Sequence, residues 1–131
     1  MLRVLFLTGL IYLAASTAMA QDPVKVDPDN WKVEFENGQV RVLRVKNGPH
    51  GKLGMHEHPA NVLITLTDSR VRDTFPDGKT QERELKAGQV VSRAAVKHAN
   101  ENLTDKPTES ILVELKAKPA MAKQPAGKKK R

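Results

Sequence analysis

Short runs of β-branched and aromatic residues, separated by turn residues about every 8–12 positions, constrain the fold of this chain more than any other feature. No segment of helical length carries an apolar stripe at helical spacing. Residues typical of tight turns separate the runs, at Asn37-Gly38, Pro76-Asp77-Gly78 and Ala87-Gly88. We therefore predict about nine strands without crossover helices, arranged as a sandwich or a small barrel.

Alternation within the runs predicts which side chains share a face of a strand. Val33 and Phe35 fall on one side of the first strand, and Ile111, Val113 and Leu115 on one side of the last. The alternation slips at Val42-Leu43, where we expect a β-bulge.

The first twenty residues have the pattern of a cleaved signal peptide. One positive charge at Arg3 precedes an apolar run, and Ala18-Met19-Ala20 has the small-x-small form of a cleavage site. The run is short for a bilayer span, so we favour cleavage after Ala20 over a retained membrane anchor. We expect a secreted or periplasmic protein without a stable membrane anchor, and the absence of cysteine excludes disulfides.

The basic charge of the chain is concentrated at its C-terminus. Of 22 basic residues, seven lie from Lys116 onward and one is Arg3, so 14 remain against 15 acidic residues. Residues 117–131 are rich in Ala, Pro and Lys, and we predict a disordered tail. The alternatives for this tail are a solvated segment that aids solubility and a segment that contacts anionic surfaces. A nucleic-acid partner is not expected, because no aromatic residues are interleaved with the basic ones.

Three histidines are the candidates for chemistry. His56 and His58 are two residues apart, so both imidazoles lie on one face if they belong to a strand. His98 follows about forty residues later and would complete a three-nitrogen site if its strand pairs nearby. The alternative is a set of rings that are only hydrogen-bonded inside a pocket.

The order of these parts resembles a small single-domain cupin of the RmlC-like superfamily. The resemblance lies in His56-x-His58-Pro59, the Pro-Asp-Gly hairpin, and His98-x-x-Glu101-Asn102 before a closing strand. It implies a double-stranded β-helix (jelly-roll) barrel over residues 30–116, preceded by a lead-in over 21–29. It also implies that His56, His58 and His98 are the metal ligands.

The sequence departs from the cupin pattern at the usual glutamate ligand. The fourth and fifth positions after His58, where that glutamate is expected, hold Val62 and Leu63. Three imidazoles with open positions suit Zn²⁺ and other divalent ions that accept nitrogen, such as Fe, Mn or Ni. Glu101, three residues past His98, is our candidate for orienting an imidazole or acting as an acid–base group, the alternative being a solvated carboxylate.

The sequence is compatible with two classes of function. One is a metal-dependent enzyme, for instance a dioxygenase or isomerase, acting on a small organic substrate. The other is a non-catalytic module that holds a metal, or a small ligand without metal, in the barrel. The resemblance further implies a homodimer that covers exposed strand edges.

Overall fold

The computed structural model describes residues 21–117, which form one short helix and nine strands. The elements in chain order are α1 (Pro23–Val26), β1 (Trp31–Glu36), β2 (Val40–Asn47), β3 (Lys52–His58), β4 (Asn61–Thr65), β5 (Ser69–Thr74), β6 (Thr80–Leu85), β7 (Val90–Arg93), β8 (Val96–Asn102) and β9 (Thr108–Leu115). The predicted signal peptide (1–20) and the predicted tail, apart from Ala117, lie outside the described residues.

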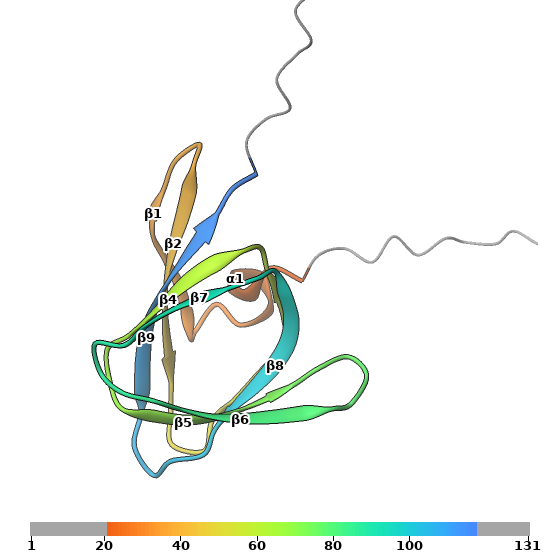
Figure 1. Cartoon of the computed structure of the whole chain (residues 1–131), viewed down its shortest axis with the longest axis vertical. Helices are drawn as coiled ribbons and strands as arrows, with labels where there is room; N and C mark the ends of the chain where they lie inside the picture. The colour runs from red at the N-terminus through yellow and green to blue at the C-terminus, as the bar shows by residue number, and fades with distance from the viewer. Residues whose placement is uncertain (1–20, 118–131) are drawn as a thin grey trace, which may run out of the picture.

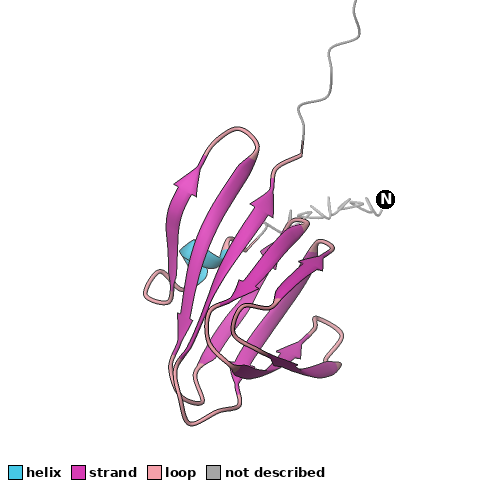
Figure 2. Cartoon of the chain, turned by 60° about the vertical axis from the view of Figure 1, so that its left-hand side comes forward, coloured by secondary structure: helices cyan, strands magenta, loops and turns pink. Residues whose placement is uncertain are grey.

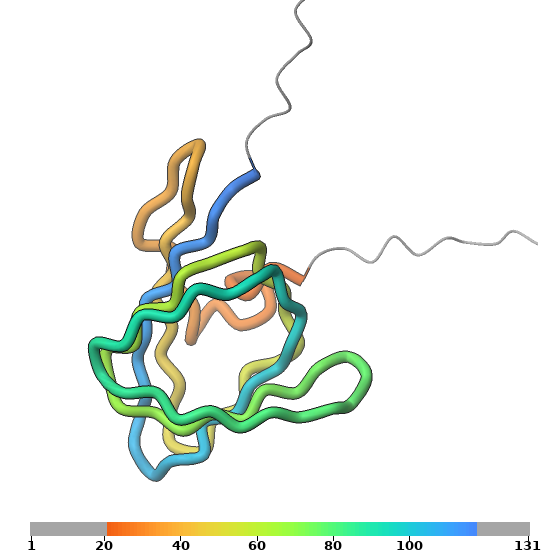
Figure 3. The backbone as a smooth tube through the Cα atoms, in the orientation of Figure 1, coloured from red at the N-terminus to blue at the C-terminus, as the bar shows by residue number. Residues whose placement is uncertain are grey.

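Two antiparallel sheets enclose one interior (Figures 1, 2 and 3). The five-stranded sheet has the order β1-β2-β9-β4-β7, and the four-stranded sheet has the order β3-β8-β5-β6. The β1–β2 and β5–β6 hairpins extend beyond the body of the barrel (Figure 1). This arrangement confirms the predicted all-β barrel.

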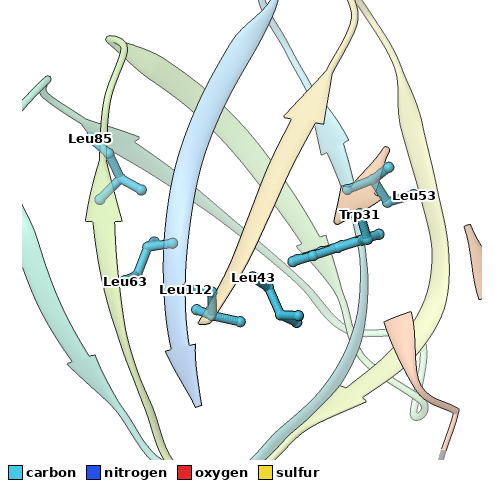
Figure 4. Packing of buried hydrophobic residues seen from close by; sticks show 6 residues of the cluster. All are labelled: Trp31, Leu43, Leu53, Leu63, Leu85 and Leu112. Atoms are coloured by element: carbon cyan, nitrogen blue, oxygen red, sulfur yellow. The ribbon is translucent and has the colours of Figure 1, made fainter. Parts of the chain in front are cut away.

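The apolar interior is built from residues in register on neighbouring strands. Leu43, Leu112 and Leu63 occupy directly paired positions on β2, β9 and β4. Figure 4 shows these three with the remaining members of the buried cluster, Trp31, Leu53 and Leu85. Burial of apolar surface at such positions is the main stabilising contribution in a domain of this size.

The apolar face predicted for the last strand is on the outside of the barrel. Ile111, Val113 and Leu115 do share a face, but Leu112 and Glu114 are the residues of β9 that point inward. Phe35 is likewise 53% exposed. Alternation therefore grouped the residues correctly, but it does not say which group faces the interior.

Two local features depart from the sequence predictions. The β-bulge is in β1, between Val33 and Phe35, and not in β2. Its two flanking residues pair with Leu43 and Val42, the positions of β2 where we expected the bulge. The lead-in contains α1, whose first turn begins with Pro23 and is capped by the Asp22 carboxylate, which accepts a hydrogen bond from the Val24 N–H at 2.9 Å.

The helix α1 packs against β1 and β3. It spans four residues, and no helix within residues 21–117 has the length and apolar character of a bilayer-spanning segment.

Asn102 fixes the two loops at one end of the barrel. Its buried amide nitrogen donates hydrogen bonds to the carbonyls of Gly48 at 2.8 Å and Lys106 at 2.7 Å, and its Oδ1 accepts one from the Thr104 N–H at 3.0 Å. The asparagine is thus bonded mainly to backbone groups and joins the β2–β3 loop to the β8–β9 loop.

Candidate metal centre

The β3–β8 pair brings the three predicted histidines together. His56 and His58 lie on the inner face of β3, and His98 on β8 is the direct Cα partner of His56. One ring nitrogen from each residue lies within 4.8 Å of those of the other two. The ring centroids are 4.8 Å apart for His56–His58, 4.9 Å for His56–His98 and 5.7 Å for His58–His98. The predicted convergence of the three imidazoles is therefore confirmed.

Each imidazole is held through its Nδ1 atom. His56 Nδ1 lies 2.6 Å from the Gly54 carbonyl oxygen, and a carbonyl can only accept a hydrogen bond. His58 Nδ1 lies 2.7 Å from Glu114 Oε1, and His98 Nδ1 lies 3.0 Å from Asp73 Oδ1. The proton is thus on Nδ1, so each Nε2 presents a lone pair, the arrangement found in metal-bound histidines.

The Nε2 atoms of His56 and His98 are buried and lack hydrogen-bond partners within residues 21–117. Buried polar atoms without a partner are uncommon in proteins, so these two nitrogens call for a ligand. Three ring nitrogens no more than 4.8 Å apart, one from each histidine, leave a central point within about 2.8 Å of each of them. Shifts below about 1 Å would reach the 2.0–2.1 Å of a metal–imidazole bond, so the residues fit a divalent ion.

Burial favours the neutral forms of His56 and His58. It lowers the pKa of His56 to about 4, although the bond to the Gly54 carbonyl acts in the opposite direction. Burial also lowers the pKa of His58, against the raising effect of Glu114. Burial raises the pKa of Asp73, but the hydrogen bond with His98 and the charge of Arg83 outweigh it, and the net pKa is lowered. The site therefore combines neutral nitrogen donors at His56 and His58 with an ionised Asp73 carboxylate behind His98.

The carboxylates behind the histidines were not predicted from the sequence. Asp73 lies on β5 and Glu114 on β9, and they are 1% and 4% exposed. Both are further paired with arginines: Asp73 Oδ2 accepts from Arg83 Nε at 2.8 Å, and Glu114 Oε2 lies 3.6 Å from Arg41 Nη1. One sequence signal pointed to Glu114: it is two residues from Leu112 and therefore lies on the same face of the strand. The sequence did not show that this face is the interior one.

Glu101 does not occupy the place predicted for it. Three residues past His98 on an extended strand is the opposite face, and its carboxylate pairs there with Lys52 at 3.7 Å and Arg72 at 3.5 Å. It orients no histidine, and Asp73 holds that position beside His98 instead. Glu57, between the two histidines of β3, points outward and pairs with Lys97 at 3.2 Å.

A cavity of about 60 Å³ lies beside the histidines. Its walls include Trp31, His58, His98, Arg83 and Arg93. The Trp31 ring is packed against His56 and His58, with centroid distances of 5.3 and 5.2 Å. The cavity has room for a few water-sized groups next to the imidazoles.

Apolar side chains, Val62 and Leu63, stand where the cupin pattern has its glutamate ligand. Leu63 points inward on β4 and belongs to the buried apolar cluster, whereas Val62 is on the other face of the strand. A metal held here would thus have three protein ligands and open positions for water or a small molecule.

Comparisons with solved structures agree with the observed fold. The chain is similar to a cupin domain from Bordetella pertussis Tohama I, with a TM-score of 0.62 and 26% identity over 66% of this chain and 92% of that one. It is also similar to a double-stranded β-helix protein from Klebsiella pneumoniae (TM-score 0.53, 18% identity, 65% of this chain and 74% of that one). An RmlC-like cupin from Methanocaldococcus jannaschii gives a TM-score of 0.51 at 15% identity, over 65% and 77% of the two chains.

These matches confirm that the chain has the cupin double-stranded β-helix fold. No family model matches the sequence, and no curated protein matches it.

Proposed function

We propose that this protein binds one divalent metal ion through the Nε2 atoms of His56, His58 and His98. The observation that carries the proposal is the pair of buried, unpartnered Nε2 atoms in rings whose Nδ1 atoms are already bonded. In a metal-free binding module these lone pairs would need other partners, and residues 21–117 supply none for His56 and His98. The identity of the ion is left to the experiment, with Zn²⁺, Mn²⁺, Fe²⁺ and Ni²⁺ as the candidates.

The bound ion would act on a small molecule in the adjoining cavity. A divalent ion with open positions supplies Lewis-acid chemistry or an activated water. The residues of this chain orient the ligand nitrogens through Asp73, Glu114 and the Gly54 carbonyl. Leu63 and Trp31 restrict water around them, because both side chains are almost fully buried.

Metal content measured after purification and after equilibration with each ion tests this proposal. We expect one equivalent in the wild type and in His50→Gln, because His50 is an exposed loop residue paired with Asp105. His98→Gln should lose most of the bound metal. A wild-type protein that takes up none of the four ions, or a His98→Gln variant that binds as tightly as wild type, would overturn the proposal. Turnover of candidate substrates by the loaded protein then separates an enzyme from a binding module.

Export after Ala20 and contact of the basic tail with anionic surfaces belong to the same proposal, and the sequence patterns at the two ends support them. A homodimer is supported by apolar side chains on the outside of the barrel, among them Val90 at 63% and Leu115 at 45% exposure. Sedimentation at micromolar concentrations tests the dimer, since a mass of one chain at all dilutions would contradict it.

A further inference from the structure

Arg93 is a largely buried guanidinium without a hydrogen-bond acceptor in the described part of the chain. It ends β7, its side chain is 18% exposed, and it lines the same cavity as His58 and His98. Its nearest carboxylate oxygen is Asp73 Oδ2, at 3.6 Å from Nη2, which is beyond hydrogen-bond distance. A charged group removed from water normally needs a partner, and Arg93 lacks a close one.

Asp73 cannot fully serve as that partner, because its oxygens are already engaged. Oδ1 faces the Nδ1 atom of His98 at 3.0 Å, and Oδ2 accepts from Arg83 at 2.8 Å from Nε and 2.6 Å from Nη2. The Asp73 carboxylate therefore already accepts hydrogen bonds from the His98 imidazole and the Arg83 guanidinium. Arg93 is therefore left beside the histidines without a hydrogen-bonded acceptor in the described residues.

The charges around the centre favour an anionic ligand once a divalent ion is bound. Within residues 21–117, the groups connected to the histidines by hydrogen bonds and ion pairs are three carboxylates and three guanidinium groups: Asp22, Asp73, Glu114, Arg41, Arg83 and Arg93. These charges balance when the imidazoles are neutral. A divalent ion would add two positive charges to the interior, so the loaded site would favour an anionic ligand.

A second unpaired hydrogen-bond donor in the cavity wall, the indole N–H of Trp31, also fits a ligand that carries acceptor atoms. The indole Nε1–H of Trp31 is buried and has no acceptor in the described residues, and Trp31 lines the cavity with Arg93. A guanidinium presents a planar fork of N–H donors that matches the two oxygens of a carboxylate.

We propose that Arg93 is the carboxylate-binding residue of this site, and that the ligand is a small organic acid. This inference rests on the proposed metal site, which would hold the end of the acid that is farther from Arg93. The carboxylate would bind the Arg93 guanidinium, and an oxygen at the other end of the molecule would face the histidines. The cavity of about 60 Å³ limits the acid to roughly two to four carbons. Arg93 is thus a specificity-determining residue that selects an acid over its uncharged analogue.

The test compares lactate with lactamide, a probe of nearly the same shape without the charge. The full chain is titrated with each probe in metal-free and Zn²⁺-loaded form, followed by nuclear magnetic resonance of the arginine side-chain Nε–H signals. We expect the Arg93 signal to move with lactate and not with lactamide, and lactate to bind at least tenfold more tightly than lactamide. Arg93→Gln should reduce lactate affinity by at least tenfold, and Arg93→Lys should weaken it less, because the charge is kept and the fork is lost.

Arg72→Gln is the matched control, since Arg72 lies on β5 next to Asp73 but on the outside, where it pairs with Glu82. It should bind lactate like the wild type. Equal binding of lactate and lactamide by the wild type, no binding of either, or unchanged lactate affinity in Arg93→Gln would overturn the inference. The probe comparison in the wild type needs no variant, so a misfolded Arg93→Gln protein does not decide the matter.

Metal equivalents are counted in every sample, which separates the two proposals. A protein that takes up no metal but still prefers lactate through the Arg93 signal would contradict the metal site alone. A protein that binds one metal ion without preferring the acid would contradict the role of Arg93 alone.

Discussion

Replacing Glu114 by Gln removes one negative charge from behind a proposed metal ligand while keeping its shape. The carboxylate lies 2.7 Å from His58 Nδ1 and is 4% exposed. A glutamine amide oxygen can still accept the hydrogen bond from Nδ1–H, so the ring should keep its orientation. The change therefore tests the charge of the partner rather than the position of the ligand.

The expected loss follows from the part that such partners play. An ionised partner raises the electron density of the imidazole, and changing one typically lowers metal affinity by about 10–100-fold. That range corresponds to about 1.4–2.7 kcal/mol of binding free energy. Arg41, 3.6 Å from Glu114, already offsets part of the charge, so we expect a value within this range rather than above it.

Zn²⁺ affinity is measured at pH 7 by competition with a chromogenic chelator. Glu57→Gln is the control, because Glu57 lies between the two histidines of β3 but pairs outward with Lys97. Its affinity should stay within about twofold of wild type, because this half-buried ion pair lies on the outer face and contacts none of the three histidines. Unchanged affinity in Glu114→Gln would refute the reasoning, and an equal loss in both variants would attribute the effect to overall charge.

Three further predictions concern stability. The pKa of His56 is about 4 in the folded chain and about 6.5 in the unfolded chain, so the unfolded chain takes up this proton first as the pH falls. The free energy of unfolding of the metal-free protein should therefore drop by about 3 kcal/mol between pH 6.5 and pH 4. In urea titrations the stability of His56→Gln should depend less on pH, and a pH dependence identical to that of wild type would contradict the assignment. Leu112→Ala removes a 2%-exposed side chain between Leu43 and Leu63, so we expect a loss of about 2–5 kcal/mol in urea unfolding, with a loss below 1 kcal/mol arguing against a packed core there. Asn102→Ala leaves backbone groups of two loops without their partner and should cost about 2–4 kcal/mol, which a thermal melt equal to that of wild type would disprove.

The sequence was sufficient to predict the barrel and its three histidines because both depend on short-range regularities. Turn residues and alternation located the strands, and the spacing of His56 and His58 required a common face on any strand. The pairing of His56 with His98 depends on register between distant strands, which the sequence alone could suggest only through the family resemblance.

The supporting residues could not be predicted because their direction is set by tertiary packing. Asp73 and Glu114 come from two further strands, and nothing local distinguishes a buried carboxylate on a strand from an exposed one. Glu101 is nearer to His98 in sequence but lies on the wrong face, since an odd spacing along a strand turns the side chain away. The outer position of Ile111 and Val113 runs against the composition of β9, because its outward face is the more apolar one and Leu112 is the apolar residue of its inward face.

All three proposed ligands lie on a single strand pair, β3 and β8, whose sequences are joined by most of the remaining barrel strands. An ion shared by these strands would act as a clasp that closes a long loop of the chain, in a protein that has no cysteine to do so. Its contribution would grow with free metal concentration, reaching about 4 kcal/mol at a thousandfold excess over the dissociation constant. Local unfolding of the barrel would then be least frequent at the β3–β8 pair. Amide protons of β3 and β8 would exchange more slowly in the metal-loaded protein, whereas exchange in the protruding β1–β2 hairpin would change little.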